Sequence, residues 1–275
     1  MRKILFLCSM FLLTVGTASA QEDKNIFEHL GVSVGVGSTG VTFDLSTHVT
    51  DYVGIRAGVD YMPEFKYKTH IKIPGVAERQ TEYNQIISQF PELPATNFPE
   101  KVDIEGKLTN FTGHVLFDLY ASKKCDWHLT LGAYFGQQNV ANIYTTDDSQ
   151  LAGAAEFNQI ITNDPTTYAN FQKIGVALGD FFLEPDADGH VAAQVKVHRV
   201  RPYVGIGYGR SVPKNHRLGI QADLGVYFWG TPKVYCQGKE LKKEDVGNSD
   251  GGFMKTLTKI KGYPALTVRL VGKIL

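Results

Sequence analysis

The side chains best suited to proton or ion transfer are aspartates, histidines and arginines that stand in alternating segments of the chain. They are Asp44, His48, Arg56, Asp60, His114, Asp118, His128, Asp223 and Arg269. Imidazoles and carboxylates can act as general acids and bases, and guanidinium groups can neutralise buried carboxylates. The chain has no His-Glu-x-x-His helix and no Cys-x-x-Cys pair, so neither a zinc hydrolase nor a redox dithiol is indicated. We therefore expect no catalytic residue, no metal site and no cofactor.

These polar residues lie on segments in which apolar side chains alternate with polar, charged or small ones. In residues 218–228 every even position is apolar, while the odd positions include Gln221 and Asp223. The same period of two runs through residues 30–37, 41–49, 53–61, 111–119, 127–135, 200–208 and 266–274. Such alternation predicts eight β-strands, each with one apolar face.

The connections between the predicted strands alternate between short and long. Short turns occupy 50–51, 121–126 and 211–216, and long loops occupy about 62–106, 138–197 and 230–262. In an up-and-down barrel, successive connections lie at opposite ends, and short turns opposite long loops are typical of bacterial outer-membrane barrels. The sequence thus predicts an all-β fold, an eight-stranded antiparallel up-and-down transmembrane β-barrel with long extracellular loops carrying short helices.

Alternation alone does not say which face of the barrel wall points inward. A secreted lipocalin-like barrel with an apolar cavity is the alternative to a membrane barrel. Strand length, aromatic residues near the strand ends and opposed charges on the polar face favour the membrane barrel. In that case the nine charged or histidine residues named first line the lumen. We expect them to form a closed, self-neutralised polar network; a proton or ion path is the functional alternative.

Composition narrows the class of protein further. The 28 Lys and Arg balance 28 Asp and Glu, which excludes a polybasic nucleic-acid binder. A mean hydropathy of −0.14 excludes a helical membrane protein but not a barrel, since only alternate strand residues face lipid. Residues 1–20 combine Arg2 and Lys3 with an apolar run and Ala18-Ser19-Ala20, which predicts a secretory signal peptide. Residues 21–275 then form a single barrel domain.

Two of the long loops share sequence. Glu82-Tyr83-Asn84-Gln85-Ile86-Ile87-Ser88 recurs 74 positions later as Glu156-Phe157-Asn158-Gln159-Ile160-Ile161-Thr162. Each copy predicts a short amphipathic helix, within 77–92 and 151–165. The apolar stripe comprises Tyr83, Ile86, Ile87, Phe157, Ile160 and Ile161. We expect each stripe to bury against its twin or over the barrel mouth; a surface for a ligand or partner is the alternative.

Strand and turn sequences carry a family resemblance. Residues 201–209, 223–232, 102–108 and the ending Tyr263-Pro264-Ala265-Leu266 resemble outer-membrane β-barrel proteins of Bacteroidota, an uncharacterised OmpA/OmpW-like group. The resemblance implies an outer-membrane barrel in a Gram-negative bacterium. Its expected partners are outer-membrane lipid and the barrel-assembly machinery, with no nucleic acid, and it is expected to be monomeric.

We expect a non-enzymatic structural or surface-interaction role for this chain. A small-ligand or lipid receptor that uses the two loop helices is the first alternative. An outer-leaflet lipid-modifying enzyme is the second, although the histidines fall on the inward face of the predicted barrel, away from lipid. The sequence names no extracellular partner.

Overall fold

The computed structural model describes residues 29–73, 75–89, 97–146, 151–178, 180–242 and 261–274. The predicted signal peptide, residues 1–20, lies outside the described residues. Within the described ranges, no helix is both long enough and apolar enough to cross a membrane.

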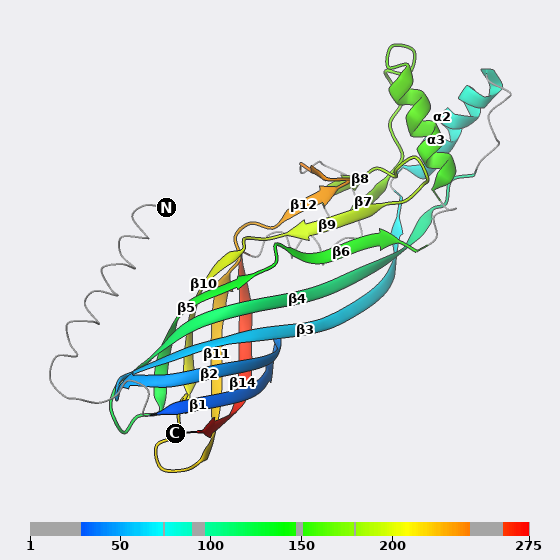
Figure 1. The fold of residues 1–275 in the computed structure, drawn as a ribbon. Helices are drawn as coiled ribbons and strands as arrows, with labels where there is room; N and C mark the ends of the chain where they lie inside the picture. Colours follow the sequence, from blue (N-terminus) through cyan, green and yellow to red (C-terminus); the bar gives the residue numbers. More distant parts are fainter. Residues whose placement is uncertain are drawn as a thin grey trace.

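Eight antiparallel strands form a closed ring (Figure 1). They are β1 (Leu30–Gly37), β2 (Gly40–Thr50), β3 (Val53–Lys72), β4 (Lys101–Tyr120), β5 (Trp127–Gly136), β10 (Val200–Tyr208), β11 (Leu218–Phe228) and β14 (Gly262–Lys273). Each strand pairs with the next of these eight, and β14 pairs with β1 to close the ring. Each of the eight contains one of the segments predicted from the alternation, to within a residue or two at the ends.

The ring is taller on one side than on the other, because five of its strands continue past the rim. β3 and β4 run on unbroken, and β5, β10 and β11 are continued, after short breaks, by β6 (Asn139–Thr145), β9 (Ala192–Lys196) and β12 (Lys233–Cys236). The continuation pairs in the order β3-β4-β6-β9-β12 and adds β13 (Lys239–Glu240), so it repeats the strand order of the ring. We call this open sheet the extension sheet.

The extension sheet corrects the prediction that residues 62–106 and 138–197 are loops. Residues 62–72 and 101–110 are paired strand. In β4 the apolar positions change from even (Val102, Ile104) to odd (Phe111, Val115) on passing into the ring, whereas in β3 they stay odd. The register shifts between Met62 and Phe65, so odd-numbered residues of β3 change faces at that point. Likewise β6, β9 and β12 occupy parts of the second and third predicted loops.

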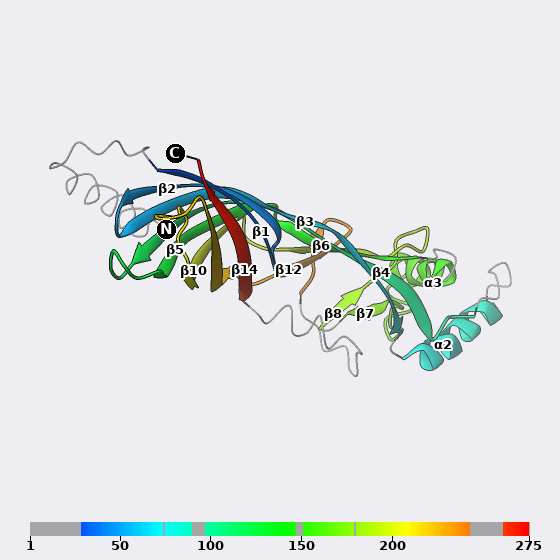
Figure 2. The ribbon, with the colours of Figure 1, turned by 90° about the horizontal axis from the view of Figure 1, so that it is seen from below.

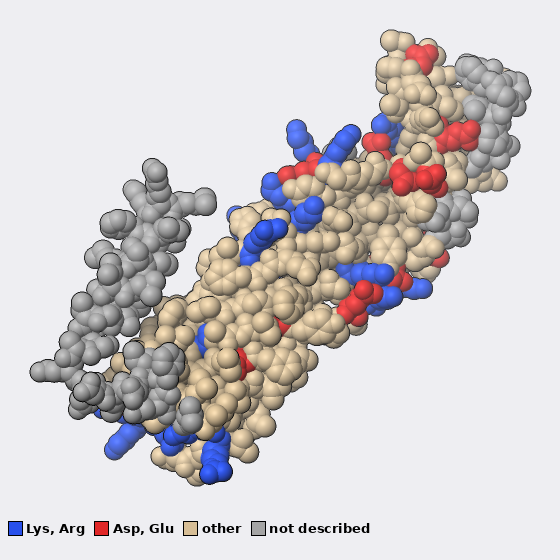
Figure 3. Space-filling view, viewed as in Figure 1, with Lys and Arg blue, Asp and Glu red and all other residues tan. Residues whose placement is uncertain are grey.

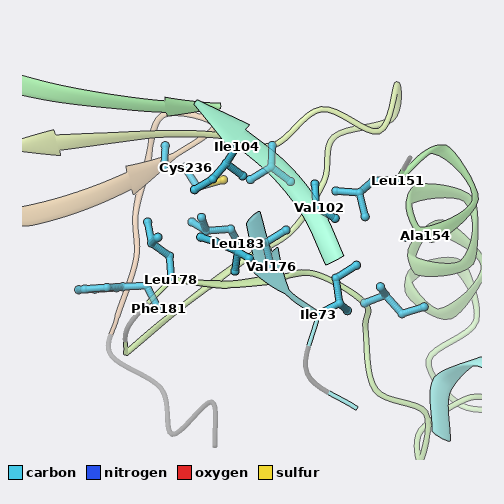
Figure 4. Close-up of a cluster of buried hydrophobic side chains, with 14 of the residues drawn as sticks. Ile73, Val102, Ile104, Leu151, Ala154, Val176, Leu178, Phe181, Leu183 and Cys236 are labelled. Atoms are coloured by element: carbon cyan, nitrogen blue, oxygen red, sulfur yellow. The ribbon is translucent and has the colours of Figure 1, made fainter. Parts of the chain in front are cut away.

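A hydrophobic core, which we call the loop core, covers the inner face of the extension sheet. Val102 and Ile104 of β4 meet the hairpin of β7 (Val176–Leu178) and β8 (Phe181–Leu183). The helices α2 (Val76–Gln89) and α3 (Ala152–Asn163) complete this loop core (Figure 4). Both helices lie at the far end of the extension sheet, well away from the ring (Figures 1 and 2). The helices therefore do not cover the barrel mouth.

Candidate functional site

The outer surface of the ring is an apolar band on every strand. Exposed aliphatic residues include Val34, Leu45, Leu131, Ile206, Ile220 and Leu270. In Figure 3 this band is almost free of charged side chains, whereas Lys and Arg gather at the turn end of the ring, and Lys, Arg, Asp and Glu lie together on the extension sheet. An apolar exterior of this extent is not expected of a protein surrounded by water.

Exposed aromatic residues border the band at both ends. Tyr52, Trp127 and Tyr208 stand at the turn end, where the rings of Trp127 and Tyr208 meet edge to face at 5.3 Å. Tyr61, Phe111, Phe135 and Phe228 stand at the opposite end. The nine residues from Trp127 to Phe135, eight residue steps, span about 26 Å along the strand, or roughly 20 Å across the band at a tilt of about 40°. This height is close to the apolar band of known transmembrane barrels.

The inside of the ring is polar and charged, with Arg56 at its centre. The Arg56 Nε atom lies 2.8 Å from Asp118 Oδ2, and Arg56 Nη1 lies 3.0 Å from Asp223 Oδ2. Arg56 Nη1 also donates to Gln221 Oε1 at 3.3 Å. Because Arg56 and Asp118 are 1% and 0% exposed, each depends on the other to remain charged away from water.

Arg269 and His114 extend the network toward the other end of the lumen. Arg269 Nε lies 2.7 Å from Asp44 Oδ2, and Arg269 Nη1 also bonds Asp223. The two ring nitrogens of His114 lie 2.7 Å from Asp44 Oδ1 and 2.8 Å from Asp60 Oδ2. Ionised carboxylates only accept hydrogen bonds, so His114 must donate from both nitrogens and is an imidazolium in this arrangement.

His128 completes the network near the turn end. Its Nε2 atom lies 2.9 Å from Asp223 Oδ1, and its Nδ1 atom lies 3.3 Å from the carbonyl oxygen of Asp126. The side-chain Nε2 atom of Gln221 lies 3.3 Å from the same His128 Nε2 atom, so His128 links Asp223, Asp126 and Gln221. Two arginines and two histidines lie among the four buried aspartates, so protein side chains supply a partner for every carboxylate of the network.

Glycines make room for these groups. A Cβ atom on Gly58 would lie 2.2 Å from Asp44 Oδ1, and one on Gly207 would lie 2.3 Å from His128 Nε2. Neither position tolerates a side chain while the network keeps its geometry. The alternation of glycine with apolar residues in the sequence thus has a steric cause.

Eight of the nine residues named from the sequence are brought together, and His48 is not. Its ring packs on Tyr120 at 5.6 Å, and neither ring nitrogen has a hydrogen-bond partner among the described residues. Sequence reasoning left out Thr130, whose hydroxyl donates to Asp118 at 2.9 Å. It also left out Arg201, which is fully buried and donates to the carbonyl oxygens of His198 and Gln137 where strands break. Both residues alternate with the outward apolar residues of their strands, so their inward position could have been predicted from the sequence.

One further sequence match is explained by the structure. Gly31-Val32-Ser33-Val34-Gly35 has the spacing of a Gly-x-Ser-x-Gly nucleophile motif, which requires a sharp turn between a strand and a helix. Here the segment is the middle of β1, and the Ser33 hydroxyl donates to Asp44 Oδ2 at 2.9 Å. Ser33 is therefore a member of the lumen network rather than an exposed nucleophile.

Two groups of residues have the proximity needed for a metal ion. Ligand atoms of Asp118, His128 and Asp223 lie within 4.8 Å of one another, but Arg56 bonds both carboxylates and supplies the positive charge. Asp186, Asp188 and His190 form the second group on an exposed turn. There the Asp186 carboxylate already accepts the backbone N–H groups of the other two residues. Neither arrangement favours a metal site.

The lumen is closed on the loop side by aromatic side chains. Tyr134, Tyr203, Tyr227 and Trp229 are each at most 6% exposed and pack on one another with ring separations of 5.3 to 6.1 Å. Tyr263 stacks on Tyr227 at 5.0 Å. We call these five residues the aromatic plug.

The turn side is closed by the segment that joins β10 to β11. Ser211 and Val212 are 1% and 2% exposed, and Ser46 Oγ donates to the Ser211 carbonyl at 2.5 Å. Arg210 lies over the Tyr120 ring at 4.5 Å and donates to three carbonyl oxygens of the 121–126 turn. Outside the lumen, hydrogen bonds from Lys123 and Lys214 lower the pKa of Asp51 to about 2. These bonds tie neighbouring turns together around the closed end.

The six apolar residues of the two loop helices are used inside the loop core. Tyr83 and Phe157 are fully buried and meet edge to face at 5.7 Å, while Ile86 and Ile161 are at most 8% exposed. Ile87 and Ile160 pack against the same core. The two stripes meet through Tyr83 and Phe157, and four of the six side chains are buried while Ile87 and Ile160 are partly exposed. The Asn158 side chain bonds both backbone groups of Ile174, which anchors α3.

Comparisons with known proteins add little to this picture. No protein-family model matches the chain, and no curated protein matches it. Among solved structures, the fold overlaps the crystal structure of CarO from Acinetobacter baumannii with a TM-score of 0.47 and 16% identity, covering 90% of this chain and 99% of that one. CarO2 from the same organism gives a TM-score of 0.45 and 16% identity, covering 89% and 98%. Similarity at this level assigns neither a family nor a function.

Proposed function

We propose that this chain is an outer-membrane β-barrel of a Gram-negative bacterium, with a closed lumen and a structural or surface-interaction role rather than an enzymatic one. The observation that carries the proposal is the distribution of side chains on the ring. Apolar residues point outward on all eight strands, and the ionic network lies inside. Lipid is the only surrounding that favours both faces of such a wall.

A lipocalin-like carrier would need the opposite arrangement. Its cavity would be lined with apolar side chains, and its exterior would be polar. Here the interior holds Arg56, Asp118 and Asp223 in direct contact, and the exterior exposes Phe43, Leu45 and Ile220 by more than half. Resemblance to the outer-membrane barrels of Bacteroidota in strand and turn sequence also supports a membrane barrel over a lipocalin-like carrier.

The position of the loops defines the orientation that we propose. Short turns are the periplasmic ends of known barrels, and long loops are extracellular. The extension sheet, the loop core and both helices then stand outside the cell as one packed unit. Packed sheet and helices at the cell surface support a role in contacts there.

A receptor that binds its ligand on the two helix stripes is less well supported, because Tyr83 and Phe157 pack on each other. A lipid-modifying enzyme needs a base that faces lipid, whereas His114 and His128 are buried in the ionic network. The receptor alternative therefore lacks accessible aromatic side chains on its helix stripes, and the enzyme alternative lacks an accessible histidine base.

Heat-modifiable gel mobility tests the barrel, and conductance tests the closed lumen. Protein refolded in detergent should run faster unheated than boiled, as a folded membrane barrel does, and planar bilayers containing it should show no porin-sized steps. A soluble carrier would show no mobility shift. Stable ohmic channels in bilayers would contradict the closed lumen but not the barrel.

A further inference from the structure

The outer face of the extension sheet carries three pairs of lysines that oppose each other directly across neighbouring strands. Lys66 faces Lys107, Lys72 faces Lys101, and Lys196 faces Lys233. Like charges placed directly opposite on a sheet are destabilising. An anion from the surroundings would offset this repulsion at a pair that the protein itself neutralises only in part.

These lysines lie on the same side of the wall as the apolar band. On β4, Val102 and Ile104 enter the loop core, so Lys107 points to the other face, which continues that of Phe111. On β9, Val195 is buried in the loop core and Lys196 lies opposite. The register shift between Met62 and Phe65 brings Lys66 onto this face as well.

Two of the pairs stand at the depth of lipid headgroups. Lys107 is four residues from Phe111, and Lys196 is four residues from Val200, the last outward residue of β10 on that side. Four residues span about 13 Å along a strand, or roughly 10 Å above the band at a tilt of about 40°. Long lysine side chains can reach back over that distance to the headgroup layer. Lys72 and Lys101 lie about 33 Å along the strand from Phe111, beyond that layer.

The nearer pairs are only partly neutralised by the protein itself. A single carboxylate, that of Glu64, lies 3.3 Å from Lys66 and 3.7 Å from Lys107. Glu240 lies 2.9 Å from Lys233. Lys196 instead lies over the Tyr235 ring at 4.3 Å, and in the described part of the chain no carboxylate is within ion-pair distance of it. On the same face Glu105 lies 3.7 Å from Lys68 and also faces Lys107. The surface just above the band therefore carries more positive than negative charge.

We propose that Lys66 with Lys107, and Lys196 with Lys233, bind the phosphate groups of an anionic glycolipid in the outer leaflet. The proposal rests on the membrane-barrel function above and deepens it by naming the lipid chemistry and its site. Acyl chains that contact the apolar band would hold the phosphates at the height of these lysines. Free phosphate has no such second contact, so it should bind more weakly.

The test is binding of lipid A that carries two phosphates to refolded protein in detergent, followed by native mass spectrometry. Three double variants are compared: Lys66→Gln with Lys107→Gln, Lys196→Gln with Lys233→Gln, and the control Lys72→Gln with Lys101→Gln. The control removes an equivalent opposed pair from the same sheet face, but at the wrong depth. At about fivefold per lysine, either near pair should weaken binding roughly 25-fold, and the control should change it less than about twofold.

Heat-modifiable mobility of each variant separates failure of this site from failure of the barrel. If wild-type protein shows no mobility shift, the barrel and the lipid site fall together. If the shift is present but all three variants bind equally, only the lipid site is wrong. Equal binding of phosphatidylcholine, or displacement of lipid A by equimolar inorganic phosphate, would also overturn it.

Discussion

Removal of the Arg56 guanidinium should destabilise the ring more than any change to its surface charges. In an Arg56→Met variant the side-chain volume is largely kept, but Asp118 and Asp223 lose the partner that lies 2.8 and 3.0 Å away. Breaking a buried ion pair on one side costs about 3–5 kcal/mol, because the remaining charge stays buried without compensation. Arg269 still contacts Asp223 but does not contact Asp118, so Asp118 should account for most of the loss.

A double-mutant cycle separates this effect from a general packing defect. Asp118→Asn removes the stranded charge, so the double variant with Arg56→Met should be destabilised by at least about 1 kcal/mol less than the sum of the two single variants. The matched surface control is Lys123→Gln, since Lys123 is 61% exposed and pairs with Asp51 at 2.8 Å. An exposed pair of this kind contributes only about 0–1 kcal/mol.

The assay is reversible unfolding in urea with the protein in lipid vesicles, followed by tryptophan fluorescence and gel mobility. Arg56→Met should lower the midpoint without a change in slope, and Lys123→Gln should leave it within error. If Arg56→Met costs less than about 1 kcal/mol, or if the two single changes are additive, the lumen is not a mutually dependent ionic network.

Three further predictions follow from the same geometry. Gly207→Ala places a Cβ atom 2.3 Å from His128 Nε2 and should lower the free energy of unfolding by about 1–3 kcal/mol in the same urea assay. The control Gly106→Ala, with no atom nearer than 3.8 Å to the added Cβ, should be close to neutral, and equal effects of the two changes would argue against a packed lumen. Phe157→Ala should destabilise the loop core by about 3–5 kcal/mol, so amide hydrogen exchange in α2 should become faster while β11 stays protected. Unchanged exchange in α2 would show that the two helices do not depend on each other. In cells, a large maleimide that cannot cross the outer membrane should label Lys239→Cys but not Lys124→Cys. The two thiols of the described residues, Cys236 (buried, with its thiol pKa raised by burial) and Cys125, are replaced by Ser, and Cys8 lies in the predicted signal peptide. The reverse labelling pattern would invert the proposed orientation.

The ring could be predicted because alternation acts locally on each strand. Whether a residue such as Asp223 faces lipid or lumen depends only on its parity within the strand, and parity can be read from the sequence. Partner choice could not be predicted in the same way. Arg56 on β3 meets Asp223 on β11 across the lumen, and the stagger of all intervening strands decides which residues share a level.

The extension sheet was missed because Pro63 and Glu64 interrupt the alternation in β3. Beyond Met62 it resumes at odd positions as Phe65, Tyr67 and Ile71, but the register shift turns the odd-numbered residues from the outer face to the inner one. In a sequence pattern such an interruption is read as the end of a strand, whereas in the structure it is a bulge within one continuous strand. Short strands such as β7 and β12 carry too few residues to show any period.

The most direct test of the membrane barrel uses its two tryptophans. Trp127 is 58% exposed on the outside of the band, and Trp229 is 6% exposed within the aromatic plug. The variant Trp229→Phe leaves only Trp127, and Trp127→Phe leaves only Trp229. In vesicles of phosphatidylcholine brominated near the glycerol end of its acyl chains, Trp127 should be strongly quenched and Trp229 hardly at all. Equal quenching of both, or none of Trp127, would contradict an apolar face in contact with lipid.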